Sequence, residues 1–291
     1  MDTKRCMAFV AAVEAKSLSG AGKELGYTPS GIIRLINALE ADLGFSLLAR
    51  SSTGVEPTAE GRRMLPIFQE MVRLDAQARQ TGARICGLAE GTLTIGALDS
   101  LATLWLPPVI REYQSRFPAV KVNVVEGSDT QLARMLERHA VDVCLFHGEH
   151  AKLKWMPLGR QELVVWAPAG SPLLKHEALL LAELDGQPFV RIHPQDNDTF
   201  DKLFFQKGLE PDVRFTADSC QTAYFMVESG LGFTLYCNGI AETWKGSVEV
   251  RPLSPRRYVE FGAAVLDAPS TPPVVEEFIQ VAQEFKGTWP K

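Results

Sequence analysis

Residues 17–44 carry helix start and stop signals so closely spaced that only short helices joined by a tight turn fit them. Ser17 precedes a short run that ends at Gly26, and Ser and Gly are favoured residues at the two ends of a helix. After the turn Gly26–Tyr27, Thr28 and Pro29 form a favoured pair for starting a second helix, which stops at Gly44. The pattern predicts a helix, a tight turn and a helix.

The second predicted helix has two distinct faces. At about 100° per residue, its large apolar side chains share one stripe that suits a core. The opposite side offers one hydroxyl, one guanidinium and one amide among small neighbours, a set that can enter the major groove, where Arg reads guanine and Asn reads adenine. An ordinary solvated helix has a polar back as well, so the face alone leaves both interpretations open. The apolar stripe is Ile32, Ile36, Leu39 and Leu43, and the polar side is Ser30, Arg34, Asn37 and Ala41.

Residues 50–58 read as a hairpin, which turns the helical pair into a winged helix-turn-helix. From residue 9 to residue 61 the chain resembles the signature of LysR-type transcription regulators. The matching residues are 9–19, Ala21, Leu25, 28–30, Leu39, Glu40, Leu43, Gly44, Leu47, Leu48, Arg50, Gly54, Val55, Thr58 and Gly61.

The resemblance implies that double-stranded promoter DNA is a partner. It implies DNA contacts at Ser17, Thr28, Pro29, Ser30, Ile33, Arg34, Asn37, Arg50 and Thr53. Three residues depart from the family pattern, because the family often has Ser at the place of Ile33, Gln at the place of Leu35 and a basic wing residue at the place of Thr53. These departures affect which operator is recognised and how tightly.

Residues 59–85 read as one long helix that resembles the family's linker helix. Its apolar positions recur at helical spacing, and a second copy of the chain is the partner expected to bury them. Packing against the chain's own first domain is the alternative. The resemblance implies a homodimer or homotetramer, with RNA polymerase as a further partner. The apolar positions are Met64, Leu65, Phe68, Met71, Val72 and Leu74.

From Gly91 onward, β-branched runs alternate with helical runs, as in an α/β domain. This order resembles the periplasmic-binding-protein-like effector domain of the same family. The expected fold is α+β multidomain: a winged helix-turn-helix at 1–58, a linker helix at 59–90 and an effector domain at 91–291. In the effector domain, 91–162 and 267–291 form one subdomain and 163–266 the other, joined by crossover strands near 163–165 and 262–265.

The predicted effector site lies beyond the carboxyl ends of strands, where helix N-termini point free N–H groups. Each residue at such a strand end could equally be a plain helix N-cap, and His147 could be a surface-loop residue. The acidic side chains among the candidate effector residues favour an uncharged or singly anionic, partly aromatic effector over a dicarboxylate, unless the side chain of Arg191 or His193 extends into the site. Trp105, Phe200, Phe204 and Tyr224 are candidate pocket or core residues. The candidate effector residues are Asp99, Ser100, Ser128, Asp129, His147, Thr199, Phe200 and Ser219.

Charge, hydropathy and motif content limit the class of protein to which the chain can belong. The net charge is −5, but residues 1–90 hold 11 basic and 10 acidic residues, so the acidity belongs to the rest of the chain. There is no long apolar run for a membrane span and no motif of a common enzyme class, metal site or cofactor site. We expect a cytoplasmic regulator with no enzyme activity, cofactor, metal or membrane partner.

A redox-responsive or ligand-independent regulator is the alternative, although the segment 191–194 lacks the cysteine of the family's peroxide sensors. The five scattered cysteines are expected to be buried, and Cys220, at a helix start, could have a lowered pKa.

Overall fold

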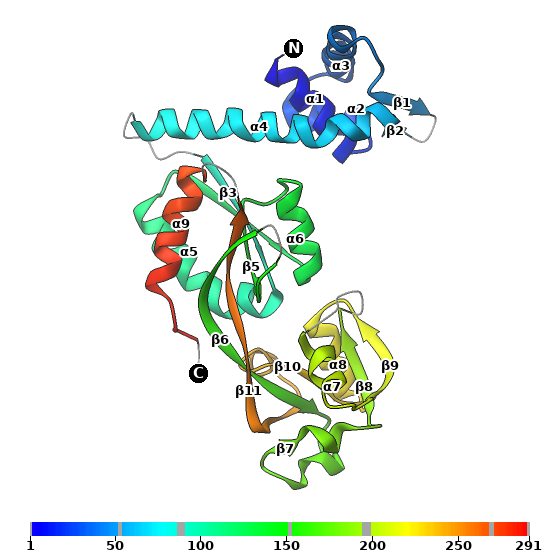
Figure 1. The fold of residues 1–291 in the computed structure, drawn as a ribbon, viewed down its shortest axis with the longest axis vertical. Coiled ribbons are helices and arrows are strands. Elements are labelled where there is room, and N and C mark those ends of the chain that lie inside the picture. Colours follow the sequence, from blue (N-terminus) through cyan, green and yellow to red (C-terminus); the bar gives the residue numbers. More distant parts are fainter. Residues whose placement is uncertain are drawn as a thin grey trace. The chain divides into compact units, whose positions relative to one another are not determined.

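The computed structural model describes residues 2–51, 54–85, 91–150, 153–193, 199–267 and 271–289. The chain forms an N-terminal unit, residues 1–89, and a C-terminal unit, residues 90–291, which we describe separately (Figure 1). Within the described ranges, no helix combines the length and the apolar character needed to cross a lipid bilayer.

The N-terminal unit begins with three short helices whose ends lie where the sequence signals place them. The side chains of Ser17 and Thr28 accept hydrogen bonds from Gly20 N and Gly31 N, at 3.2 and 3.1 Å. Gly26 and Gly44 end α2 and α3 in the left-handed conformation, as predicted. The elements of this unit are α1 Thr3–Glu14, α2 Leu18–Leu25, α3 Pro29–Leu43, β1 Leu48–Ser51, β2 Gly54–Pro57 and α4 Ala59–Ile85.

The wing is the antiparallel pair β1–β2, as the hairpin pattern predicts. Its position is fixed by the turn that follows α1, because Val55 N donates to the Lys16 carbonyl oxygen at 3.3 Å. Gly54 has a φ of +134°, and a Cβ there would lie 2.6 Å from the same oxygen. This close approach requires glycine at the start of β2.

One core holds the three helices, the wing and the first half of α4 together. Ile32, Ile36 and Leu39 of α3 are fully buried in it, which confirms the predicted apolar stripe, and Leu43 is half-buried. Phe68 of α4 contributes to the same core. Its ring meets that of Phe9 edge-on, with 5.5 Å between centroids.

The C-terminal unit contains a seven-stranded mixed sheet, whose order is β10-β6-β11-β5-β3-β4 with β7 beside β11, and a parallel two-stranded sheet of β8 and β9. β3 runs parallel to β4 and β5, whereas β11 runs antiparallel to β5 and β6. The strands are β3 Gly91–Ala97, β4 Val120–Glu126, β5 Val143–His147, β6 Leu153–Ala167, β7 Leu179–Leu180, β8 Pro188–Ile192, β9 Asp212–Ala217, β10 Thr234–Cys237 and β11 Glu249–Leu266. The helices are a π-helical turn Leu101–Trp105, α5 Leu106–Arg116, α6 Asp129–Glu137, α7 Thr199–Phe205, α8 Cys220–Glu228, α9 Pro273–Glu284 and single 3₁₀ turns at Pro172–Lys175, Leu181–Leu184 and Ala241–Thr243.

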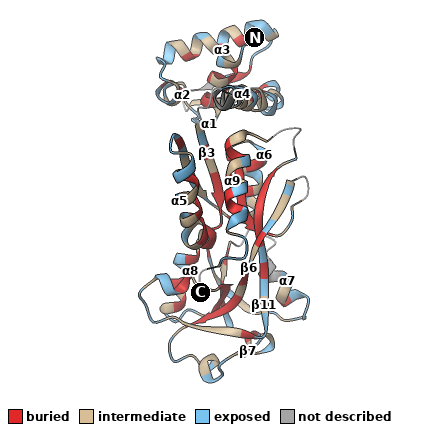
Figure 2. Cartoon of the chain, turned by 90° about the vertical axis from the view of Figure 1, so that its left-hand side faces the viewer, coloured by how far each residue is buried: buried red, intermediate tan, exposed pale blue. Residues whose placement is uncertain are grey.

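Two hydrophobic cores divide the C-terminal unit into a first half and a second half, and β6 and β11 run through both. On β6, Leu158 belongs to the core of the first half and Leu163 to that of the second. On β11, Phe261 and Val259 show the same division. Figure 2 shows buried residues along both strands. The segments 163–165 and 262–265 are therefore parts of longer strands that connect the halves.

Candidate DNA-binding and effector-binding sites

The polar side of α3 is open to solvent. Ser30, Arg34, Asn37 and Ala41 are all exposed, opposite the buried stripe, so the sequence prediction of the two faces is confirmed. Ile33 is half-buried at the edge of the exposed face, and Leu35 packs against the core. The exposed face thus presents a guanidinium, an amide and a hydroxyl from one helix.

The start of α3 is capped by a hydroxyl and lies at the surface. Thr28 uses its hydroxyl as the N-cap, and Thr28 Oγ1 lies 3.1 Å from Ser30 Oγ. Pro29 occupies the first helical turn and is exposed. Ser17 caps α2 in the same way. Such helix starts hold N–H groups and hydroxyls that favour phosphate oxygens.

Glu40 connects α3 to the wing, a contact that sequence reasoning missed. Its Oε1 accepts hydrogen bonds from Leu47 N at 2.6 Å and Leu48 N at 3.1 Å. Leu48 is the first residue of β1, so one carboxylate sets the wing relative to α3. Of the predicted wing contacts, Thr53 lies outside the described residues, and the side chain of Arg50 does too.

The apolar side chains of α4 lie on two different faces of the helix, which corrects the single stripe expected from the sequence. Met64, Leu65, Phe68, Met71 and Val72 all belong to or pack against the core of the N-terminal unit. Phe68 is 0% exposed, so it is not available to a second copy. Ile67 and Leu74 are 53% and 47% exposed, respectively, and Ile67 was absent from the expected stripe. The prediction failed because two apolar stripes at helical spacing overlap on one helix.

In the C-terminal unit, Asp99 and Ser100 follow β3, but Ser100 is not the N-cap that the sequence suggested. Ser100 has helical backbone angles and makes no side-chain capping bond. Its hydroxyl is buried and accepts a hydrogen bond from Gln161 Nε2 at 3.2 Å. The Asp99 carboxylate accepts from Ser100 N at 2.9 Å, from Cys220 N at 3.0 Å and from the Tyr236 hydroxyl.

His147 is the last residue of β5 and is buried, so its interpretation as a surface-loop histidine is wrong. His147 Nε2 lies 2.7 Å from Gln161 Oε1 and 3.8 Å from Cys237 Sγ. Its backbone N–H donates to the Asp129 carboxylate at 3.2 Å. Gln161 therefore links His147 to Ser100 in one buried polar chain.

The other predicted caps differ in how far the structure describes them. Ser128 forms a capping box with Gln131 at the start of α6, and Ser219 caps Thr222 N at the start of α8. Thr199 is the first residue of α7, whereas the side chains of Thr199 and Phe200 lie outside the described residues. The structure thus brings Asp99, Ser100 and His147 into one hydrogen-bonded region, and Asp129 adjoins it through His147.

Both units of the chain also match models of one protein family. A model of the LysR substrate binding domain matches residues 87–286, and a model of the lysR family of bacterial regulatory helix-turn-helix proteins matches residues 3–62. The chain belongs to the LysR family. It is a DNA-binding transcriptional regulator with an effector-binding domain.

Individual relatives cover nearly all of this LysR-family chain. The uncharacterized HTH-type transcriptional regulator YvbU of Bacillus subtilis (strain 168) is 25% identical over 282 residues, 96% of this chain and 97% of the relative. Full-length CbnR in complex with its target DNA has a TM-score of 0.70 at 19% identity, covering 98% of this chain and 100% of CbnR. A variant of full-length OxyR from Pseudomonas aeruginosa has a TM-score of 0.72 at 18% identity, covering 97% and 98%. These structures show that the fold is shared.

The cysteines of this LysR-family regulator are buried at the four described positions. Burial raises the pKa of the Cys220 thiol, and the neighbouring Asp99 raises it further, so the expected lowering at a helix start is wrong. Burial also raises the pKa of Cys144, to about 12.

Trp105, Phe204 and Tyr224 are buried in the two cores, which confirms the core interpretation of these aromatic residues. Among the described residues, no group of His, Cys, Asp and Glu side chains could hold a metal ion.

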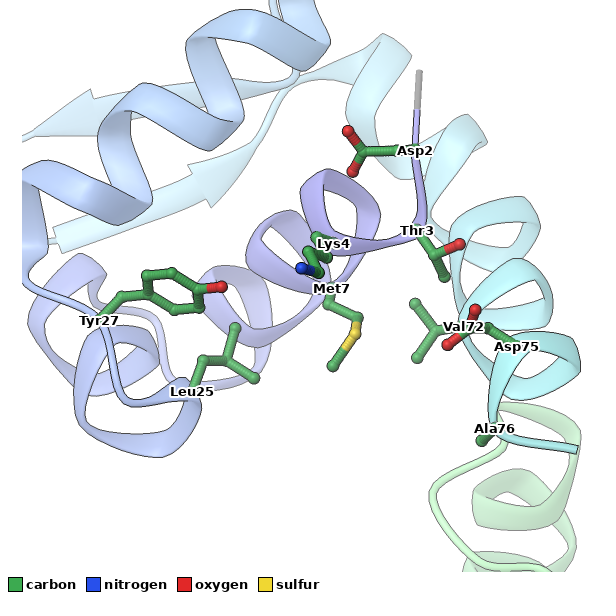
Figure 3. A pocket seen from close by; sticks show the side chains of 9 residues that line it. All are labelled: Asp2, Thr3, Lys4, Met7, Leu25, Tyr27, Val72, Asp75 and Ala76. Carbon is green, nitrogen blue, oxygen red and sulfur yellow. The ribbon is translucent and has the colours of Figure 1, made fainter. Parts of the chain in front are cut away.

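The N-terminal unit of this LysR-family regulator also has a pocket that the sequence did not indicate. Its volume is about 730 Å³, and it lies where α4 extends past α1 and the turn before α3 (Figure 3). The Tyr27 ring faces it from that turn. Its lining residues are Asp2, Thr3, Lys4, Met7, Leu25, Tyr27, Val72, Asp75 and Ala76.

Proposed function

We propose that α3 enters the major groove of promoter DNA, where Arg34 and Asn37 contact base edges. The observation that carries this proposal is the exposed polar face of α3 opposite an apolar stripe that packs into the core. Arg and Asn can each make two hydrogen bonds to one base. Ile33 contacts a thymine methyl group. The DNA backbone is contacted by residues at the helix starts, Ser17, Thr28, Pro29 and Ser30, and by the wing residues Arg50 and Thr53.

Arg34→Ala and Asn37→Ala should each weaken specific DNA binding by about 1–3 kcal/mol, because each removes a base contact. Binding sites are first selected from a random DNA pool with the unmodified protein, and affinities are then measured by fluorescence anisotropy. Binding to DNA of unrelated sequence should change little for Asn37→Ala, which keeps the charge. Arg138→Ala, an exposed arginine of the C-terminal unit, is the control. Unchanged specific affinity in both α3 variants would contradict the proposed groove contact.

Self-association is proposed through the outer face of α4. Ile67, Met71, Leu74 and Ala78 follow each other at spacings of four, three and four residues, the pattern of a coiled-coil seam. Ile67, Leu74 and Ala78 are exposed in the single chain, although Met71 also packs against the core. A second copy that covers this face would remove apolar surface from water. The same dimer would present two α3 helices to two half-sites.

The effector is proposed to bind beside the carboxyl ends of β3 and β4, near Asp99, Ser100, Ser128, Asp129 and His147, with Thr199, Phe200 and Ser219 from the second half. β3 and β4 pair in parallel with Ala97 opposite Glu126, so Asp99, two residues after β3, and Glu126, the last residue of β4, lie at the same edge of the sheet. Burial raises the pKa of Glu126, and the charge of Asp99 raises it further. Because negative charge is already disfavoured there, we expect an uncharged or singly anionic, partly aromatic effector.

Matched pairs of ligands test this charge preference. An aromatic diacid and its monomethyl ester have nearly the same shape but differ by one charge. Across several such pairs in a thermal-shift experiment on the full chain, the monoester should stabilise the protein more, because the second carboxylate meets Asp99 and Glu126. A diacid that consistently stabilises the protein more than its monoester would overturn the proposed effector class.

A further inference from the structure

The Asp99 carboxylate lies between the two halves of the C-terminal unit and accepts hydrogen bonds from both. Asp99 follows β3 in the first half, where Ser100 N donates to Oδ1 at 2.9 Å. Cys220 and Tyr236 belong to the core of the second half. Cys220 N donates to Oδ2 at 3.0 Å, and the Tyr236 hydroxyl donates to Oδ1. One side chain therefore joins segments more than a hundred residues apart in the sequence.

The donors on the second half form an anion site from two independent elements. Cys220 is the first residue of α8, a helix of nine residues, so its N–H has no partner within the helix. Ser219 satisfies Thr222 N, which leaves Cys220 N for Asp99. Tyr236 lies on β10 and is 3% exposed, and its hydroxyl points to the same carboxylate. A helix N-terminus and a buried hydroxyl that converge on one point favour an anion there.

We propose that Asp99 is an internal ligand: its carboxylate fills an anion site that would otherwise accept a small carboxylate, and it thereby holds the two halves together. This inference rests on the proposed effector-dependent function for one consequence only. Because Asp99 already fills the site, an external effector places no carboxylate at the start of α8. The site itself is defined by Ser100 N, Cys220 N and the Tyr236 hydroxyl. When the internal carboxylate is removed, a free carboxylate of the same size should replace it.

Formate rescue of Asp99→Ala in the full chain tests the proposal, because alanine lacks only the carboxylate that formate supplies. Asp99→Ala should lower the unfolding temperature of the C-terminal unit by about 5 °C or more. Sodium formate should restore at least half of this loss along a saturating curve, whereas sodium chloride at equal ionic strength and neutral formamide should not. Formate should leave the unmodified protein unchanged, since Asp99 occupies the site. In Asp99→Ala/Tyr236→Phe, the formate concentration for half-maximal rescue should rise about tenfold.

A folded Asp99→Ala variant that responds to formate no more than to chloride would overturn the proposal. If Asp99→Ala does not fold, Asp99→Asn and Tyr236→Phe provide a second measurement. Asp99→Asn replaces one acceptor oxygen with an NH2 donor and weakens the contact that Tyr236→Phe removes, so their combined shift in unfolding temperature should be smaller than the sum of the single shifts. Additive shifts would overturn the proposal. Neither measurement uses DNA or an effector, so failure of the proposed function leaves these results interpretable.

Discussion

Replacing Phe68 with alanine should lower the free energy of unfolding of the N-terminal unit by about 3–5 kcal/mol. Phe68 is fully buried and meets Phe9 edge-on, so the substitution leaves a cavity between α4 and α1. Urea denaturation followed by circular dichroism measures the loss. Phe45→Ala is the matched control, because Phe45 is 37% exposed and lies outside the core of this unit. The control should cost about 1 kcal/mol or less.

An equal, small loss in the Phe68 and Phe45 variants would contradict the packing of α4 against α1. The result also bears on assembly. A Phe68 variant that changes mass in solution does so because the N-terminal unit is damaged, so it cannot report on the proposed seam.

Ile67→Glu should convert the assembled protein into monomers while the N-terminal unit stays folded. Ile67 is 53% exposed in the single chain, so glutamate there meets water in a monomer. In the proposed seam the same charge would lie in an apolar contact, which is costly. Light scattering measures the mass, and circular dichroism verifies the fold. Leu74→Glu should behave in the same way.

Ala76→Glu is the matched control for the seam. Ala76 is exposed on the same helix but lies nine residues from Ile67, about 180° around the helix axis. This variant should keep the mass of the unmodified protein. A stable monomer before any substitution, or an Ile67→Glu protein that assembles normally, would show that α4 does not form the seam.

Local signals in the sequence predicted the N-terminal unit well. The caps at Ser17 and Thr28 and the terminations at Gly26 and Gly44 depend on residues within one turn of each other, so they can be recognised without the fold. The faces of α3 followed from helical periodicity alone. On α4 the same reasoning failed, because periodicity does not show which of two neighbouring residues, Ile67 or Phe68, faces the core.

The candidate effector region was predicted only in part, because its contacts join distant segments. Strand ends and caps indicated Asp99, Ser128 and Ser219. The partners of Asp99 and His147 carry no local signal, since Tyr236 is 137 residues from Asp99 and Cys237 is 90 residues from His147. His147 was misplaced because the sequence does not distinguish the last residue of a strand from the first residue of a loop. The raised pKa of Cys220 likewise depends on burial and on Asp99, far away in the chain.

The Glu40 carboxylate has a consequence for redesigning the DNA specificity of this regulator. Because Glu40 accepts from Leu47 N and Leu48 N, the last turns of α3 also set the position of the wing. A chimera that replaces the whole of α3 with a helix from another regulator would therefore alter both elements that are proposed to contact DNA. A graft limited to residues 29–39 keeps Glu40 and exchanges Arg34 and Asn37, the residues proposed to contact bases, so new specificity can be tested on an unchanged wing.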